Sequence, residues 1–454
     1  LNKVIVDNLI IKDQSGNVVI KAKKATASVN LLLPSRIPRV DAYDGEVYLE
    51  RYKDNKFNIF NILPPNDPKK KVTVDKASRI GKIYVHNAIL YYSDTSFSKK
   101  IAKTLKNVNG YLSVSKSRGF SLEAKGNGDE QEKINIELKQ MVNNKESLKS
   151  LFDTKKNTDE SKKEFYLGFI FENIKVTEEL GQYVPLDMIK IKKGILDGTL
   201  NLSNKYSEKK MKTDGKLVVK NGTLEYVDYY GDIENIDATI EMKKNIITVN
   251  ATKIINNNPF VFDLYTNIEK GDLNLKFNAK NTPFQEVTKY KLFRNANVKA
   301  KGDVTGNLNV DINTKTKETS LNGKFTSPNI ILAKYNFRDL KTSISMTKDQ
   351  ILTVENTSFH FDETIAGFKV KDDVSSKKFV YNIKEKKGVA DYTITNKGSD
   401  YDIPAINGTG TLDKNNIIRG NFASNKISGD FIIEPLKSLM TLNAKGKDYV
   451  AIKY

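Results

Sequence analysis

The chain has 454 residues and no cysteine, and its 74 Lys and Arg residues against 55 Asp and Glu residues give a formal charge of +19. The lack of cysteine excludes disulfides, thiolate metal sites and cysteine nucleophiles. The lysines are spread along the sequence, and no dense basic run is interleaved with aromatic residues, so we expect no nucleic-acid binding. A solvated outer face, with some attraction to anionic lipid headgroups, accounts for the positive charge.

Residues 1–33 alternate between apolar and polar side chains, as β-strands with one buried face do. No run of about 18 apolar residues occurs, so no membrane-spanning helix is predicted. Because residue 1 is Leu and the strand pattern starts at once, we expect a signal or membrane anchor to precede this sequence. A strand pattern at 57–63 leads into a proline-rich linker or long loop at 64–71.

Strand patterns resume between residues 81 and 139, and the polar segment 141–163 predicts a mobile loop or a weak helix. Two short helical segments are expected next, one at Thr177–Val184 and one opening with Thr282-Pro283-Phe284-Gln285. The second resembles a helix N-terminus, because Thr282 is suited to cap it, Pro283 suits the first helical position and Gln285 completes a capping box.

The segment 173–226 recurs at a spacing of 108 residues. The residues that share this spacing are Asn173, Gly194, Gly198 and Gly215, matched by Asn281, Gly302, Gly306 and Gly323. A fainter copy begins at Gly81. Repeats of this size indicate a body that grows by adding similar units. We expect one continuous elongated body with N-terminal strands at 1–72, a weak repeat at 73–163, repeats at 164–280 and 281–390, and C-terminal strands at 391–454.

Asn-Gly and Asp-Gly pairs predict where strands reverse, since these residues accept the positive φ of hairpin turns. The predicted turns lie at Asp214-Gly215, Asn221-Gly222, Lys243-Lys244-Asn245, Glu269-Lys270-Gly271-Asp272 and Asn407-Gly408. Such turns join antiparallel neighbours. The predicted fold is therefore mostly β: a long, curled, antiparallel sheet that forms a groove, with a few short helices.

One face of the predicted strands is apolar and the other is polar over almost the whole chain. We expect the apolar positions to line the groove and to bind lipid. These candidate residues are Leu200, Leu202, Leu217, Val219, Ile240, Met242, Leu273, Leu275, Phe277, Leu308, Val310, Ile312, Phe325, Ile344, Met346, Phe359 and Phe361. A single bulge reverses the faces of a strand, so bulges decide which residues truly share one face.

A sheet of this kind exposes a large apolar patch unless it closes on itself as a core or curls into a trough. A closed core is the simpler interpretation of the alternation. Few helical segments are available to cover the sheet, however, and additive repeats favour an extended body over a globule. These two features favour the trough, and an apolar trough suits the acyl chains of phospholipids.

The sequence offers little for chemistry. Its two histidines, His86 and His360, each lie in a strand pattern, whereas a zinc site or a Ser-His-Asp triad needs further partners. The phosphate-binding and hydrolase signatures are missing. We expect no enzymatic activity, no cofactor and no metal.

Several stretches resemble the AsmA-like superfamily, and among its members the N-terminal, periplasmic part of TamB. These stretches are VIVDNLIIKDQSGNVVIKAKKATASVNLLL at 4–33, GEVYLERYKDNKFNIFNIL at 45–63, PLDMIKIKKGILDGTLNLS at 185–203 and GKLVVKNGTLEYVDYYGDIENIDATIEM at 215–242. The resemblance extends over most of the chain.

The resemblance implies a bridge-like lipid transport protein that is anchored in the inner membrane and crosses the periplasm. It implies a curled β-sheet whose apolar groove moves phospholipid between the inner and outer membranes and so supports outer-membrane integrity. It also implies an outer-membrane partner of the BamA class, engaged through C-terminal regions outside this sequence. The family brings no catalytic residues.

Two other functions stay open on the sequence. One is a chaperone-like translocation and assembly factor for outer-membrane or autotransporter β-proteins, which binds client strands at a sheet edge. The other is a surface adhesin passenger whose apolar face is an ordinary closed core.

Overall fold

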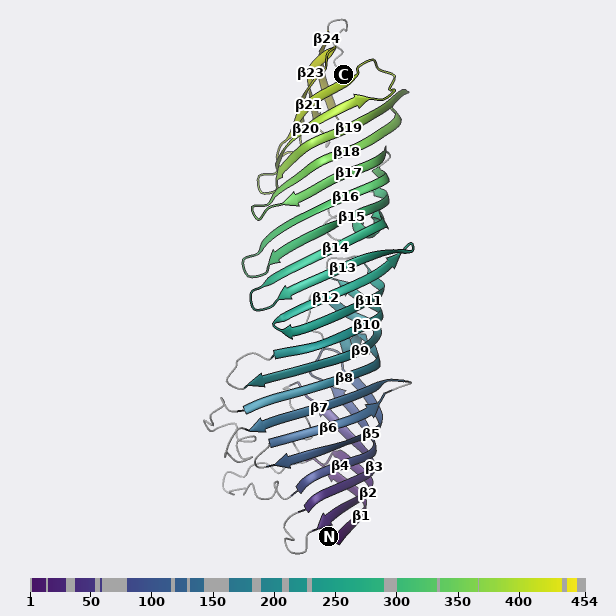
Figure 1. The fold of residues 1–454 in the computed structure, drawn as a ribbon, viewed down its shortest axis with the longest axis vertical. Helices are drawn as coiled ribbons and strands as arrows, with labels where there is room; N and C mark the ends of the chain where they lie inside the picture. Colours follow the sequence, from purple (N-terminus) through teal and green to yellow (C-terminus); the bar gives the residue numbers. More distant parts are fainter. Residues whose placement is uncertain are drawn as a thin grey trace. The chain divides into compact units, whose positions relative to one another are not determined.

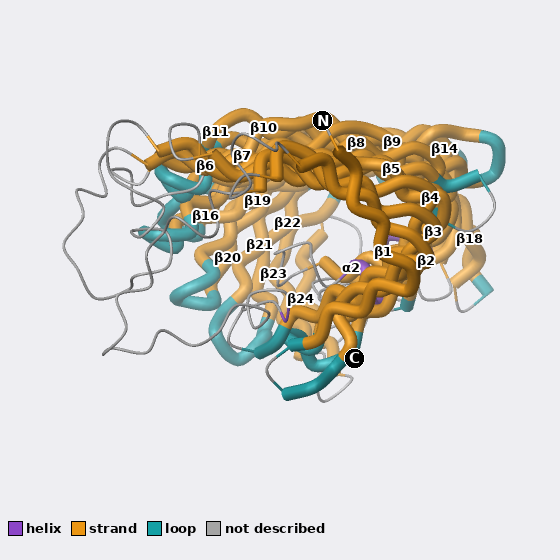
Figure 2. Tube along the Cα trace, turned by 90° about the horizontal axis from the view of Figure 1, so that it is seen from below, coloured by secondary structure: helices purple, strands orange, loops and turns teal. Residues whose placement is uncertain are grey.

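The computed structural model describes residues 2–13, 15–29, 37–53, 58, 80–115, 119–128, 131–142, 163–181, 189–205, 212–226, 231–289, 300–332, 335–365, 367–434 and 439–446. Within them the chain is mostly β, with strands in long succession and two short helices, α2 and α3 (Figures 1 and 2). The pairing is largely antiparallel, as the sequence predicts. The predicted linker at 64–71 and most of the polar segment 141–163 lie outside the described residues.

The chain divides into two compact units, the first formed by Leu1–Glu225 and Ile233–Asn245 and the second by Tyr226–Asp232 and Ile246–Tyr454. The boundary falls inside the predicted repeat 164–280. In neither unit is the sheet strongly curled or closed. The prediction of a long, largely antiparallel sheet is therefore confirmed.

The first unit contains eleven strands and the helix α2. Their bounds are β1 (Asn2–Lys12), β2 (Val18–Val29), β3 (Ile37–Arg51), β4 (Ile80–Asp94), β5 (Ile101–Ser115), β6 (Gly119–Asn127), β7 (Lys133–Val142), β8 (Lys163–Thr177), α2 (Glu178–Gly181), β9 (Ile189–Lys205), β10 (Lys212–Tyr226) and β11 (Asp232–Lys244). From β4 to β9 each strand pairs antiparallel with the next in the chain.

The second unit contains thirteen strands and the helix α3. Their bounds are β12 (Ile246–Ile255), β13 (Asn258–Asn267), β14 (Asp272–Pro283), α3 (Phe284–Thr288), β15 (Ala300–Asn313), β16 (Glu318–Leu332), β17 (Tyr335–Met346), β18 (Ile351–Ile365), β19 (Phe368–Asn382), β20 (Lys387–Asn396), β21 (Ala405–Leu412), β22 (Ile418–Ala423), β23 (Ile427–Glu434) and β24 (Leu439–Gly446). Consecutive strands pair antiparallel throughout this unit.

One strand pair departs from the predicted antiparallel meander. β3 and β4 run parallel, with Val40 beside Ile83 and Leu49 beside Tyr92. A two-residue hairpin cannot join parallel strands, which need a long crossover. Residues 52–79, which contain the prolines that predicted a linker, supply that length.

Three of the five predicted hairpin turns are wrong. Asp214-Gly215 and Asn221-Gly222 both lie inside β10, and Asn407-Gly408 lies inside β21. The predictions at 243–245 and 269–272 are confirmed, because strands end and begin there. Asn221 does adopt a positive φ of 50°. The conformation that suits Asn to a hairpin turn also suits it to a bend within a strand.

Such left-handed Asn and Asp residues recur inside the strands of both units. They are Asn8, Asp44, Asn87, Asn107, Asn173, Asn221 and Asn235 in the first unit, and Asn281, Asp339 and Asn356 in the second. At Asn107, Asn173 and Asn281 the pairing with the neighbouring strand shifts by one residue, which is the signature of a β-bulge. Bulges let long strands bend locally without breaking the ladder.

The two copies of the sequence repeat share the same local structure, a left-handed Asn whose N–H donates to a side chain of the next strand, followed by a short helix. The N–H of Asn173 in β8 donates to Asp197 Oδ1 in β9 at 2.7 Å, and the N–H of Asn281 in β14 donates to Thr305 Oγ1 in β15 at 3.0 Å. A short helix follows in each copy, α2 after β8 and α3 after β14, which confirms both predicted helical segments. The predicted capping box is wrong, because the described residues offer the Thr282 hydroxyl no hydrogen-bond partner.

Candidate functional site

The strand register of the second unit brings the predicted apolar residues together. Leu275 lies between Leu264 and Val310, and Phe277 lies between Phe262 and Leu308. Directly paired residues point to the same side of a sheet. By this criterion all the candidates of the second unit share one face, which we call the second apolar face. They are Leu273, Leu275, Phe277, Leu308, Val310, Ile312, Phe325, Ile344, Met346, Phe359 and Phe361.

Two bulges keep the face continuous across β17 and β18. Ile344 pairs with Val354, and Phe337 pairs with Phe361, although an odd number of residues separates these positions along each strand. The left-handed residues Asp339 in β17 and Asn356 in β18 each add one residue to their strand. Without them, alternation would turn Phe359 and Phe361 to the opposite side.

The first unit has an apolar face of its own. Phe169 of β8 lies between Ile136 and Leu200, and its ring stacks on Phe171 with centroids 5.6 Å apart. Lys216 and Glu241 form an ion pair (2.7 Å) on the polar face of β10 and β11. Successive side chains of a strand point to opposite faces, so the candidates Leu217, Val219, Ile240 and Met242 lie on the apolar face. Leu202 is placed by its backbone, beside Leu167.

The candidate residues are half-buried rather than sealed in a core. Of those whose side chains are described, only Val219 is buried, at 6% exposure, and the rest have intermediate exposure. The first unit has a small buried cluster formed by Ala88, Leu105 and Val108. A two-layer sandwich would bury the central positions of its inner faces. Among the described residues, most of each apolar face has no second layer over it.

Aromatic rings lying over glycines are the feature that sequence reasoning missed. A Cβ added at Gly388, Gly306 or Gly429 would lie 2.7–2.9 Å from an aromatic carbon of Phe379, Phe325 or Phe422, respectively. Glycine leaves room for a ring to lie flat on the neighbouring strand. The missed residues on the second face include Phe260, Phe262, Leu264, Phe337, Phe379, Tyr381, Tyr392, Phe422 and Phe431. The alternation in Phe260-Val261-Phe262-Asp263-Leu264 was the signal for the first three.

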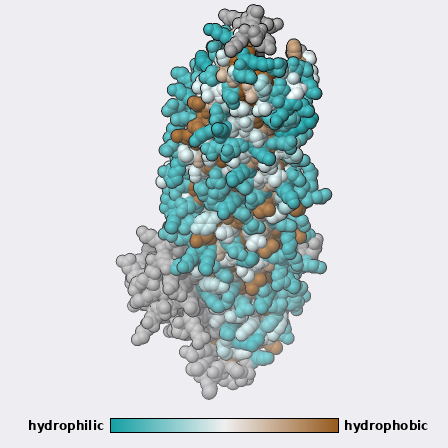
Figure 3. All heavy atoms as spheres, turned by 45° about the horizontal axis from the view of Figure 1, so that its top comes forward, coloured by the Kyte–Doolittle hydropathy of each residue, from teal (hydrophilic) through white to brown (hydrophobic). Residues whose placement is uncertain are grey.

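The opposite faces of the strands are polar. Asn274 donates to Asn309 Oδ1 at 2.8 Å and to Asp311 Oδ1 at 2.6 Å across β14 and β15. Figure 3 shows one side of the molecule, where hydrophilic residues predominate and apolar residues are scattered among them. These cross-strand polar contacts leave the charged residues in water and direct the apolar residues to the other side.

Three ion pairs lie at apolar-face positions near strand ends. In the first unit Arg51 Nη1 is 3.2 Å from Asp94 Oδ2, and Lys103 pairs with Glu132, which is 1% exposed. In the second unit Lys253 of β12 approaches Glu286 of α3 at 3.6 Å. These pairs place charge at the margin of otherwise apolar surfaces.

Both histidines lie beside an Asp, on strands β4 and β18. His86 Nε2 is 2.9 Å from Asp41 Oδ1, and its ring stacks on Tyr43 with centroids 4.7 Å apart. Two hydrogen bonds of 2.7 Å from Arg39 are the main cause that lowers the pKa of Asp41. His360 Nδ1 is 2.6 Å from Asp373. In each case the Asp lies on the neighbouring strand and also pairs with a cation, Arg39 for Asp41 and Lys397 for Asp373.

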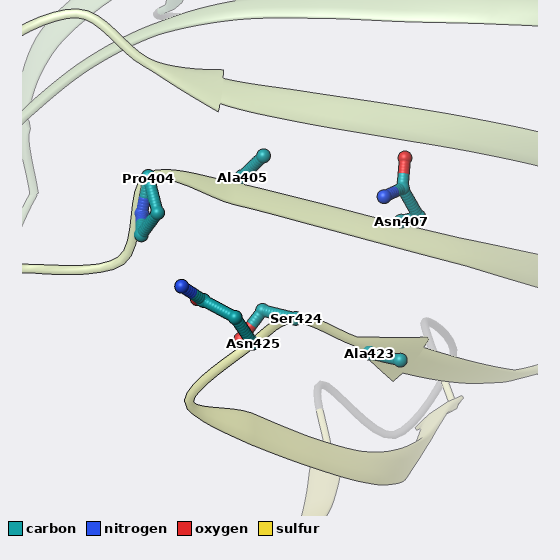
Figure 4. Close-up of a pocket in the computed structure, with 6 residues that line it drawn as sticks. All are labelled: Pro404, Ala405, Asn407, Ala423, Ser424 and Asn425. Carbon is teal, nitrogen blue, oxygen red and sulfur yellow. The ribbon is translucent and has the colours of Figure 1, made fainter.

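A pocket of about 370 Å³ lies away from the apolar face. It is lined by Pro404, Ala405, Asn407, Ala423, Ser424 and Asn425, and Asn425 extends toward Pro404 (Figure 4). Asn407 alternates with Gly408, which lies on the second apolar face, so the pocket opens on the polar side. Its lining brings no titratable group.

In the described part of the chain, His, Asp and Glu side chains form no group of three suited to a metal ion. The two described helices are four and five residues long, too short to cross a bilayer. No family model, no curated protein and no solved structure matches this chain.

Proposed function

We propose that the chain is a bridge-like conduit that carries phospholipid between the inner and outer membranes across the periplasm, with the acyl chains on its apolar faces. The observation that carries the proposal is the half-burial of aligned apolar residues on long, uncovered strands. Soluble proteins rarely leave contiguous apolar surface of this extent without a partner for it. The stretches that resemble TamB support the periplasmic setting, an inner-membrane anchor outside this sequence and a BamA-class partner.

The energetics suit a lipid ligand. An acyl chain of about 16 methylenes gains roughly 0.8 kcal/mol per methylene on leaving water, or about 13 kcal/mol in all. That free energy is the barrier to free diffusion through an aqueous gap. Successive strands present similar apolar side chains, such as Leu264, Leu275 and Val310 in one row. A uniform lining holds the acyl chain without fixing it at one position, and bulges bend the strands around it into a groove.

The direct test is mass spectrometry of an organic extract of the purified, folded chain. We expect phospholipid at a ratio of at least about one molecule per chain. A folded, monomeric protein that yields no lipid, and that takes up none from vesicles, would overturn the proposal.

A second candidate is the strand-binding assembly factor, which β1 favours. Val4, Ile5, Val6 and Ile10 of this strand are 42–56% exposed, and they point alternately to both faces. β1 pairs with β2 on one side, and an edge strand with exposed apolar residues is a ready template for pairing with another strand. Binding of an unfolded outer-membrane β-protein that is lost in an Ile5→Lys, Ile10→Lys variant would support this function, and unaltered binding would contradict it.

A further inference from the structure

Lys253 occupies a position that the strand pattern reserves for apolar residues. Val249, Ala251 and Lys253 are every second residue of β12, so all three lie on the second apolar face. Lys253 pairs directly with Phe260 of β13. Its side chain is 20% exposed. A long lysine side chain can lay its methylenes on apolar surface while its ammonium reaches the margin. The ammonium therefore sits where an apolar strip meets water.

The carboxylate nearest to Lys253 is shared with a second lysine. Glu286 Oε2 lies 3.6 Å from Lys253 Nζ, which exceeds hydrogen-bond length, whereas Glu286 Oε1 accepts a hydrogen bond of 2.7 Å from Lys289 Nζ. The three side chains together carry a formal charge of +1. Lys253 is thus held by attraction at a distance and is available to a closer anion.

The apolar surface beside this charge is aromatic. The ring of Phe277 lies 5.2 Å from that of Phe262 and 6.3 Å from that of Phe260, measured between centroids. Leu264 and Leu275 continue the row along the same strands. A cation next to such a strip matches the layout of an amphiphile with an anionic head and an apolar tail.

We propose that Lys253 binds the phosphate of an anionic phospholipid headgroup while the acyl chains lie over Phe260, Phe262 and Phe277. This inference rests on the proposed function, and it adds a headgroup class and a fixed point along the conduit. An anionic headgroup is favoured over a zwitterionic one, because a choline group would add a further positive charge beside those of Lys253 and Lys289.

Lys103 of the first unit is a lysine on an apolar face that has a structural role, and it serves as a comparison for Lys253. It also lies on an apolar face, beside Tyr92, but its partner Glu132 is 1% exposed and also accepts the backbone N–H of Lys175 at 2.7 Å. That carboxylate is fixed in place against its lysine. The contrast assigns the headgroup site to Lys253 and not to Lys103.

To test this, the purified chain is incubated with vesicles that contain equimolar dioleoyl phosphatidylglycerol and dioleoyl phosphatidylcholine, two lipids with identical acyl chains. Mass spectrometry then gives the ratio of the two lipids on the re-isolated protein. We expect about fivefold enrichment of phosphatidylglycerol on the wild-type chain, the gain that one basic residue brings at an anionic surface. Lys253→Met should abolish the enrichment, and Glu286→Gln should increase it because it removes the shared negative charge.

Lys276→Met is the matched control, since Lys276 lies on the polar face of β14 opposite Asp263 and should keep the wild-type ratio. Circular dichroism checks that every variant is folded. Lipid uptake without headgroup preference, or a preference that Lys253→Met leaves intact, would overturn the headgroup site alone. No lipid uptake at all would overturn the conduit and the site together. Loss of enrichment in the presence of millimolar inorganic phosphate would show a free-anion site and contradict the headgroup assignment.

Discussion

The hydroxyl of Tyr392 in β20 donates a hydrogen bond of 2.9 Å to the backbone carbonyl of Asn421 in β22, two strands away. The ring reaches that far by lying over Gly408 of the intervening strand β21, which pairs with Tyr392 directly. A side chain on Gly408 would collide with the phenol. The contact ties three strands of the second unit together and flattens an aromatic ring onto the apolar face.

Gly408→Ala should therefore destabilise the second unit. The added methyl group displaces the Tyr392 ring and presses on the backbone of Asn421, and overpacking of this kind costs roughly 1–3 kcal/mol. The measurement is the urea midpoint of unfolding. Gly410→Ala is the matched control: it lies two residues along the same strand and face, and its nearest neighbour is an oxygen at 3.9 Å. Equal shifts for the two variants would contradict the role of the ring.

Substitutions of Asn173 test whether the β-bulges need a residue that accepts the left-handed conformation. Its φ is 54°, and its N–H donates to Asp197, a hydrogen bond that is the main cause of the lowered pKa of that carboxyl. Asn173→Ala should lower the free energy of unfolding by roughly 1–2 kcal/mol, because alanine is strained in the left-handed region. Asn173→Gly should cost much less, since glycine adopts this conformation freely. Two variants of equal stability, measured by urea denaturation, would exclude backbone strain as the reason for Asn at this position.

Thr282 and Thr177 should respond in opposite directions to the same substitution. Thr282 is 1% exposed, and within the described residues its hydroxyl has no hydrogen-bond partner, so Thr282→Val should raise the free energy of unfolding by roughly 1 kcal/mol. Thr177 Oγ1 accepts the N–H of Leu180 at 3.4 Å at the start of α2, so Thr177→Val should lower it by roughly 0.5–1 kcal/mol. Thermal unfolding of both variants gives the comparison, and destabilisation by Thr282→Val would point to a partner for that hydroxyl.

The free energy of unfolding should fall at alkaline pH because of Tyr401. Burial, together with its 2.6 Å hydrogen bond to Asp372, raises the pKa of Tyr401 from 10.0 to about 12. The folded state therefore holds the phenol proton more tightly, a contribution that is complete below pH 10 and lost as the pH rises toward 12. Urea midpoints measured across this window should fall more steeply for the wild type than for Tyr401→Phe. Parallel curves would show that Tyr401 does not contribute to the decline.

Strand alternation was enough to predict a mostly β chain and to place residues such as Leu275, Val310 and Ile344 on one face. It failed at Asn221-Gly222, because one backbone conformation serves both a hairpin turn and a bulge, and only the pairing of the neighbouring strands distinguishes them. It also missed the parallel pair of β3 and β4, since parallel and antiparallel neighbours look alike in a short alternating strand.

Lys253 was missed for a related reason. A lone lysine in an apolar row looks like an exception to the pattern, and only the contact with Glu286 of α3 shows what holds it there. The glycines under the aromatic rings were equally invisible, because each ring and its glycine belong to different strands. Contacts between strands, unlike the faces of single strands, follow from register, which bulges and loop lengths decide.

Leu275→Glu separates a lipid-binding face from an ordinary core. Leu275 has intermediate exposure between Leu264 and Val310, so its ionised replacement can reach water and should cost roughly 1–2 kcal/mol of stability. The same charge lies in the path of an acyl chain, and we expect phospholipid recovered by mass spectrometry to fall severalfold. Lys276→Glu, one residue along on the polar face of β14, should leave both quantities near wild type. If Leu275→Glu instead unfolds the second unit, and the recovered phospholipid falls only in proportion to the unfolded fraction, the apolar face is a closed core and the conduit proposal is wrong.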